Sequence, residues 1–183
     1  MTSDLPSSTD PTGAPGFAAA LQRHFADLRD LQHGNAVSRE GKEELFRTAA
    51  RYLHPYAVRV LGEIDEHLLL GTGQIGAPGV VRDAEGGLVC DWTLSWELQQ
   101  RSGVSPVTLR AFYGSGFHHP HLRGGTVGDW PLNVFTEEQA AAELPTLRAI
   151  ASADLHNLVF LRDYRIVPAT TAVAARLGLG FVR

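Results

Sequence analysis

The sequence has a single cysteine, Cys90, and a single lysine, Lys42. One thiol cannot form a disulfide within the chain, and zinc sites built from repeated cysteine pairs are excluded. A net charge of −4 leaves no basic excess of the kind that marks a nucleic-acid partner or an anionic membrane. No apolar run approaches the roughly 18 residues needed to span a bilayer. The first 16 residues lack the positive start and apolar core of a secretory signal. We therefore expect a soluble, cytoplasmic protein with no nucleic-acid or membrane partner.

The chain is long enough for one domain with a sizeable core. It has 183 residues, of which 44% are apolar and 20% charged, as is usual for globular proteins. Residues 1–15 are mostly Ser, Pro, Thr, Asp and Gly, with little to bury. This composition predicts a flexible tail over 1–15 and a single domain over 16–183.

Two helices are expected near the start of the chain. Apolar residues recur at spacings of three and four along a helix that ends near Gly34, namely Phe17, Leu21, Phe25, Leu28 and Leu31. Ser38 is a suitable N-cap for a second helix. Its expected buried line is Leu45, Ala49 and Leu53, and Pro55 is expected to end it.

The middle of the sequence predicts β-structure. Val58 with Val60 suggests one strand and His67–Leu70 another. Residues 88–98 give the strongest signal, because apolar and mostly polar residues alternate over the whole stretch. Residues 79–82 and the turn at 83–87 make this strand the second arm of a hairpin. A further strand, over 107–113, follows Pro106 and leads into a histidine-rich loop.

The rest of the chain mixes helix and strand. Thr136 begins a capping box for a helix that Pro145 should kink or divide. Residues 157–167 predict one long strand or a tight hairpin, and a short helix capped by Thr170 or Thr171 ends near Gly178. The order of elements predicts an α+β fold with N-terminal helices packed on a mainly antiparallel sheet, a meander, followed by further helix and strand.

The central strand places two groups of residues on opposite faces. Cys90 shares a face with Trp92 and Trp96, where a free cysteine behaves as a small core hydrophobe. The opposite stripe predicts either a solvated sheet face or the polar lining of a ligand cavity. Its members are Asp91, Thr93, Ser95, Glu97 and Gln99.

The stretch GFHHPHLRGG, residues 116–125, is the best candidate site. In extended backbone His119 and His121 point to one side and His118 to the other. Two imidazoles on one face could begin a divalent metal site for zinc, iron, nickel or copper. A third ligand must come from elsewhere, and His156 is the candidate that we favour over His67, Asp129 or Glu97. The His-x-His spacing also occurs in cupins, but no carboxylate stands in residues 122–126, where that pattern requires one.

The same loop could act without a metal. His118, His119 or His121 could transfer protons near neutral pH, and Asp129 could orient one of them. Arg123, Gly124 and Gly125 could hold an anionic substrate, with Trp130 as a pocket wall. The alternative is that the glycines only form turns and the histidines only pack locally.

One resemblance bears on this loop. His119-Pro120-His121-Leu122, the glycine pair after it and Gly128-Asp129-Trp130 together resemble the stretch before the active cysteine in prokaryotic relatives of ubiquitin-conjugating enzymes. In that family an N-terminal helix also precedes a β-meander. The nucleophilic cysteine and the proline-rich approach are missing here, so the resemblance implies a catalytically inactive, binding-only relative.

Two hypotheses for function follow. The first is a small enzyme or ligand-binding protein that uses the histidine-rich loop on a small, anionic molecule, with or without a divalent metal. The second is a non-catalytic interaction module that binds another protein or a second copy of itself. The first predicts a concave pocket into which at least two of the loop histidines project.

Overall fold

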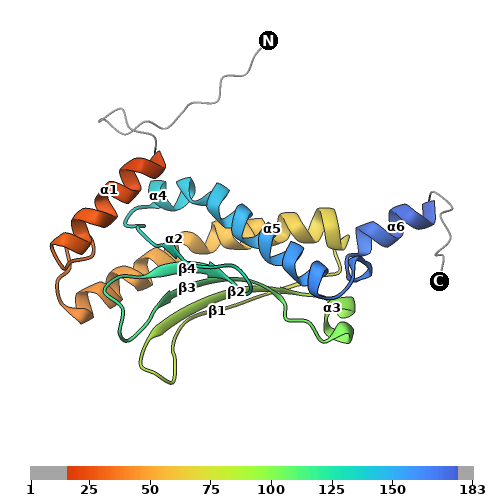
Figure 1. Ribbon diagram of the computed structural model, residues 1–183, viewed down its shortest axis with the longest axis horizontal. Coiled ribbons are helices and arrows are strands. Elements are labelled where there is room, and N and C mark those ends of the chain that lie inside the picture. The colour runs from red at the N-terminus through yellow and green to blue at the C-terminus, as the bar shows by residue number, and fades with distance from the viewer. Residues whose placement is uncertain (1–15, 177–183) are drawn as a thin grey trace, which may run out of the picture.

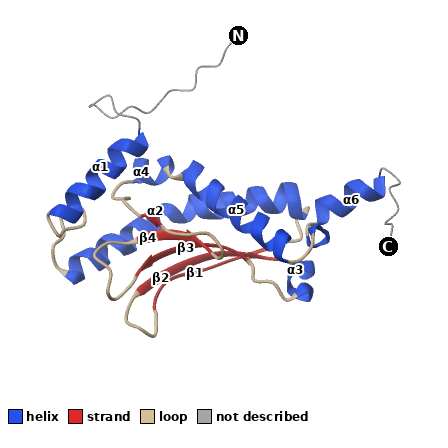
Figure 2. Cartoon of the chain, in the orientation of Figure 1, coloured by secondary structure: helices blue, strands red, loops and turns tan. Residues whose placement is uncertain are grey.

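A long helix, α2 (Arg39–Ile64), packs with α5 (Leu144–Leu161) on one face of a five-stranded antiparallel sheet (Figures 1 and 2). The computed structural model describes residues 16–176. The strands lie in the sheet in the order in which they occur along the chain, which is the predicted meander. The predicted α+β class, with helices on an antiparallel sheet, is confirmed. The tail predicted over 1–15 lies outside the described residues.

Helix α1 (Gly16–Arg29) forms where the apolar spacing predicts a helix, but it ends before Gly34. Its apolar stripe is largely exposed: 60% of Phe25 and 64% of Leu31, just beyond the helix, are accessible. The polar residues His24 and Asp27 are buried instead. One reason is that Asp27 accepts the Gly34 N–H at 2.7 Å and so orients this side of the helix inward.

Helix α2 begins as predicted and runs much further. The Ser38 hydroxyl accepts the Gly41 N–H and caps the helix. Pro55 does not end the helix, because Pro55 is exposed and the buried line continues beyond it through Ala57 and Leu61. Proline removes one backbone hydrogen bond, and burial of the opposite side outweighs that loss. The strands predicted at Val58–Val60 and at 67–70 are therefore wrong: the first lies in α2, and a π-helical turn, Asp65–Leu69, covers most of the second.

The sheet is built around the predicted hairpin. Strands β1 (Gln74–Arg82) and β2 (Leu88–Ser95) join through a turn in which Asp83 accepts the Glu85 and Gly87 N–H groups. Strand β3 (Val107–Tyr113) matches its predicted bounds, and β4 (His121–Gly124) and β5 (Trp130–Pro131) complete the sheet. The strand predicted to reach residue 98 stops at Ser95.

The reason for that earlier end is a short helix, α3 (Glu97–Ser102). Trp96 takes its N-cap position, and Gln99 Oε1 accepts the Trp96 N–H. Trp96 is fixed by its own ring as well, since Nε1 donates to the Ile166 carbonyl. Glu97 and Gln99 therefore leave the polar stripe, which keeps Asp91, Thr93 and Ser95.

The last third of the chain is helical. Thr136 caps α4 (Glu137–Ala142), and Pro145 stands in the first turn of α5, so the predicted division at this proline is confirmed. The strand predicted over 157–167 is wrong: residues 157–161 complete α5, and a 3₁₀ turn, Tyr164–Ile166, follows. Helix α6 (Pro168–Arg176) begins before the predicted caps Thr170 and Thr171, and Gly178 lies outside the described residues.

Cys90 occupies the core position that the alternation predicts. Its side chain is 3% exposed, and burial, aided by nearby Asp91, raises the pKa of the thiol to about 11. Because only the thiolate reacts, we expect Cys90 to react with an aromatic disulfide reagent at least about 100-fold more slowly in the native protein than after unfolding. Absorbance of the released thiolate measures both rates. Labelling at the unfolded rate under native conditions would contradict the core assignment.

Candidate functional site

The histidine-rich loop connects β3 to β4. His121 starts β4 opposite Phe112 of β3, and its ring stacks on the Phe112 ring at 5.4 Å. The His119 and His121 rings lie 4.4 Å apart, so the structure brings this candidate pair together. His118 is exposed.

Two further histidines that sequence reasoning missed join this pair. The His24 ring of α1 meets the His119 ring edge-on at 4.2 Å. His33, in the connection between α1 and α2, is 1% exposed, and its ring lies 4.8 Å from the Phe135 ring. No spacing in the sequence links these segments, because the contacts depend on how α1 packs against the loop between β3 and β4. We call His24, His33, His119 and His121 the histidine cluster.

The first turn of α2 holds both parts of the histidine cluster. Lys42, although buried, donates from Nζ to the Leu31 carbonyl at 3.0 Å and to the His118 carbonyl at 3.2 Å. Arg39 donates to the Tyr113 and Gly114 carbonyls, and its guanidinium stands 3.6 Å from the centre of the Tyr113 ring. The only lysine of the chain thus joins the α1 connection to the histidine loop.

The histidine cluster favours neutral imidazoles. Burial lowers the pKa of His33 to about 4; Lys42 and His24 add to this and Asp27 opposes it. Burial also lowers the pKa of His119 to about 4, with His121 and His24 adding to the effect. Both ring nitrogens of His33, and Nδ1 of His119 and of His121, are buried with no hydrogen-bond partner. A protonated ring would have to donate from both nitrogens, so charge is costly here.

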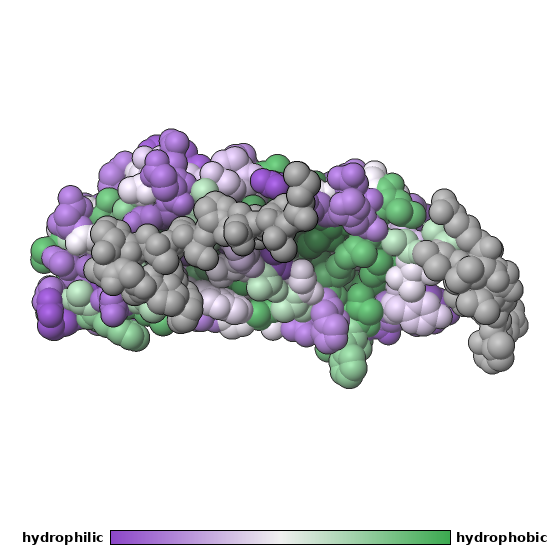
Figure 3. All heavy atoms as spheres, turned by 90° about the horizontal axis from the view of Figure 1, so that it is seen from above, coloured by the Kyte–Doolittle hydropathy of each residue, from purple (hydrophilic) through white to green (hydrophobic). Residues whose placement is uncertain are grey.

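The predicted metal triad is not gathered. His156 of α5 is exposed and lines an apolar groove of about 300 Å³ with Leu68, Tyr164 and Thr170 of α6, among others. Seen from the helical side, apolar side chains gather around a hollow toward the α6 end (Figure 3), whereas α1 lies at the opposite end of the molecule (Figure 1). Within residues 16–176, no three His, Cys, Asp or Glu side chains are placed to hold a metal ion. The predicted divalent metal site therefore gains no support from the described residues.

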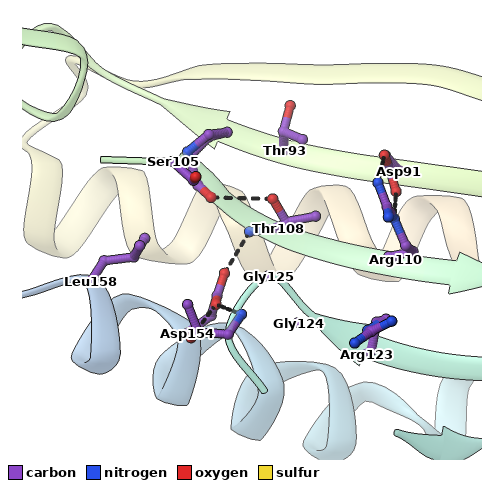
Figure 4. Close-up of a pocket in the computed structure, with 12 residues that line it drawn as sticks. Asp91, Thr93, Ser105, Thr108, Arg110, Arg123, Gly124, Gly125, Asp154 and Leu158 are labelled. Carbon is purple, nitrogen blue, oxygen red and sulfur yellow. Dashed lines mark hydrogen bonds and ion pairs between the residues drawn. The ribbon is translucent and has the colours of Figure 1, made fainter. Parts of the chain in front are cut away.

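Arg123, Gly124 and Gly125 do line a cavity. It has a volume of about 520 Å³ and lies where β4 diverges from β3, beside α5 (Figure 4). We call it the sheet pocket. Its other walls come from β2, from β3 with the residues before it, and from α5. They include Asp91, Thr93, Ser105, Thr108, Arg110, Thr126, Asp154 and Leu158.

The two arginines of the sheet pocket are held differently. Arg110 makes a two-point ion pair with Asp91, with both N–O distances 2.7 Å, and this pair raises the pKa of Arg110. Arg123 has one ion-pair contact, from Nε to Asp129 at 3.4 Å, and its guanidinium carbon lies 5.3 Å from the centre of the Phe112 ring. Asp91 and Thr93 are the part of the predicted polar stripe that lines a cavity.

A buried carboxylate, Asp154, fixes the wall of the pocket. It is 0% exposed, and it accepts the Thr108 N–H at 2.8 Å and the Thr126 N–H and hydroxyl at 2.6 Å each (Figure 4). A side chain at Gly125 would place its Cβ 3.2 Å from this carboxylate. Sequence reasoning missed Asp154, because an aspartate within an apolar helix has no motif around it.

The remaining predicted residues lie outside the described lining of the sheet pocket. Trp130 of β5 is half-buried opposite Leu122 and packs against the core. Asp129 contacts Arg123 and raises the pKa of His121, while burial has the larger, lowering effect on it. Asp129 therefore lies between His121 of the histidine cluster and Arg123 of the sheet pocket.

We expect Asp154→Ala to destabilise the fold strongly. The substitution removes a carboxylate and leaves the part-buried Thr108 and Thr126 N–H groups without their acceptor, at about 1–3 kcal/mol for each. Denaturant unfolding should show a loss of at least about 2 kcal/mol. The matched control is Asp30→Ala, an exposed aspartate outside the pocket that pairs with its neighbour Arg29. Equal, small losses in both variants would contradict this role.

The free energy of unfolding should fall as the pH is lowered from about 6.5 to about 4. His33 is neutral in the folded state over this range but protonated in the unfolded chain, so acid favours unfolding by about 1.4 kcal/mol per pH unit. His33→Leu should flatten the slope by about that amount. An unchanged slope in His33→Leu would contradict the neutral state.

The comparisons with known proteins add no family. No protein-family model, no curated protein and no solved structure matches the chain. The resemblance to ubiquitin-conjugating enzymes thus rests on residues 119–130 and on the order of helix and meander.

Proposed function

We propose that this protein binds a small anionic molecule in the sheet pocket. One observation carries the proposal: Arg123, which the sequence marks as an anion-binding residue, lines a cavity together with the glycine pair and a second arginine, Arg110. A volume of about 520 Å³ suits a ligand of metabolite size.

Arg123 would make the primary contact. A guanidinium has five N–H donors in a planar fork, and the single contact with Asp129 uses only Nε. Arg123 is also 42% exposed at its side chain, so a ligand can reach it. Arg110 would contribute charge from a fixed position, because Asp91 holds it at two points. The Thr93 and Thr108 hydroxyls would complete the polar surface.

Binding is proposed here in preference to catalysis. Among the described residues that line the sheet pocket none is a histidine, so a ligand in this pocket would be bound by arginine and hydroxyl groups and not by His118, His119 or His121. The described residues contain no helix that could span a membrane. We propose a cytoplasmic location on a separate ground, because a chain with one cysteine has no internal disulfide that would need an oxidising compartment.

Titration calorimetry with inorganic phosphate, citrate and malonate tests the proposal. At least one of these anions should bind, and Arg123→Gln should weaken it by about 10–100-fold, the equivalent of about 1.5–3 kcal/mol for a charge-assisted contact. Arg101→Gln is the matched control, because Arg101 pairs with Glu97 on the surface of α3. Equal affinity in the two variants would contradict a role for Arg123, and failure of all three anions to bind would contradict the anionic ligand.

A second candidate is a non-catalytic interaction module. The observation in its favour is the order of helix, meander and histidine loop, which agrees with the resemblance to ubiquitin-conjugating enzymes. The only thiol of the chain, Cys90, is buried in β2 and not in the loop. This candidate predicts that the anions do not bind.

A further inference from the structure

Helix α1 presents its apolar residues to solvent. Leu21 is 39% exposed, Phe25 60% and Leu28 37%. In most surface helices the apolar stripe faces the core and the polar residues face water. Here the side that faces the protein carries His24 and Asp27, both buried.

The attachment of α1 explains how this arrangement persists. In the part of α1 whose side chains are described, only Ala19, His24 and Asp27 are buried. Polar groups make the attachment: Asp27 accepts the Gly34 N–H, and His24 packs on His119. The apolar stripe therefore contributes little to holding α1 in place.

The exposed stripe has the spacing of a helix-pairing seam. Half-buried Ala18 and the exposed Leu21, Phe25 and Leu28 follow one another at intervals of three, four and three residues, as do the a and d positions of paired helices. Gln22 and Arg29 flank the stripe at the e positions, and no acidic residue interrupts it. A second helix with the same spacing could pack along it.

The segment that precedes α1 has few side chains that could cover the stripe. Residues 1–15, which lead into α1, contain only Met1, Leu5 and Ala14 as apolar side chains besides proline. α1 lies at one end of the elongated molecule (Figure 1), so a second copy can approach it away from α6 and the apolar groove.

We infer that α1 pairs with α1 of a second copy of this chain, antiparallel about a twofold axis beside Phe25. Leu21 then lies next to Leu28 of the partner subunit, and each Gln22 faces Arg29 of the partner subunit, so like charges do not meet. The start of each helix lies beside the end of the other, which also suits the helix dipoles. A twofold contact uses the same surface on both copies.

The size of the seam sets the expected strength. Helix α1 has 14 residues and is about 21 Å long. A single pair of such helices buries less than the roughly 1,600 Å² of a standard interface, so the dimer is weak and depends on concentration. A dissociation constant of about 1–100 μM is expected.

Sedimentation equilibrium between about 5 and 500 μM tests the dimer at the concentrations that such a constant requires. The wild-type protein should pass from monomer to dimer, and Phe25→Glu should raise the dissociation constant at least about 100-fold by placing two carboxylates at the axis. Phe160→Glu is the matched control, since Phe160 is 86% exposed on α5. A wild-type monomer at all concentrations, or association lost in Phe160→Glu and kept in Phe25→Glu, would overturn the inference.

Disulfide crosslinking tests the orientation. Mixed Leu21→Cys and Leu28→Cys proteins, one carrying a size tag, should form the mixed disulfide faster than either variant crosslinks to itself. Buried Cys90 keeps the background low. Faster self-crosslinking of each variant would overturn the antiparallel arrangement. None of these substitutions touches the sheet pocket, so the outcome is separate from anion binding.

Discussion

Helices cover the sheet on one face only. This one-sided burial decides which strand side chains lie on the open face, where they can contact a ligand. Because side chains alternate along a strand, burial of Cys90, Trp92 and Leu94 against α2 and α5 directs Asp91 and Thr93 to the other face. The same alternation in β3 buries Leu109 and places Arg110 on the open face of the sheet. A polar surface on the open face is therefore a consequence of the core. The sheet pocket forms where α5 reaches past the edge of β3 toward that surface.

Asp154 shows how this edge is stabilised. Strand β4 pairs with β3 only from Leu109 onward, so the Thr108 N–H has no strand partner at that point. The carboxylate from α5 accepts that N–H, and at the same time it holds the loop after β4 through Thr126. A carboxylate buried this deeply is tolerated because three donors surround it. It thereby connects the packing of α5 to the shape of the pocket.

The sequence predicted those elements whose signals are local. The alternation in 88–95, the hairpin turn at Asp83 and the caps at Ser38 and Thr136 depend on residues within a few positions of one another, and each is found. Pro55 misled the prediction, because its local penalty is outweighed by buried contacts one and two turns later. Residues 157–161 are apolar enough for a strand, but they continue the buried side of α5 that begins at Leu147. Both segments are helical because each extends a long row of buried residues on one side of a helix, which local composition does not reveal.

The residues of the candidate site also fall into those that local sequence identifies and those that it does not. Arg123 with its glycines and the pair His119–His121 could be identified from the loop alone. His24, His33 and Asp154 could not, because folding brings them to the site from distant segments.

The surroundings of the histidine cluster also account for the unusual face of α1. The inner side of α1 contacts the rest of the protein through polar groups, namely Asp27 and neutral imidazole rings. The apolar residues of α1 are then left on its outer side. A helix attached through so few contacts gains stability when its outer side is covered. Pairing with a second copy would supply that cover with the same residues that the attachment leaves exposed. The histidine cluster then has a structural consequence of its own: it sets which side of α1 is available to a partner.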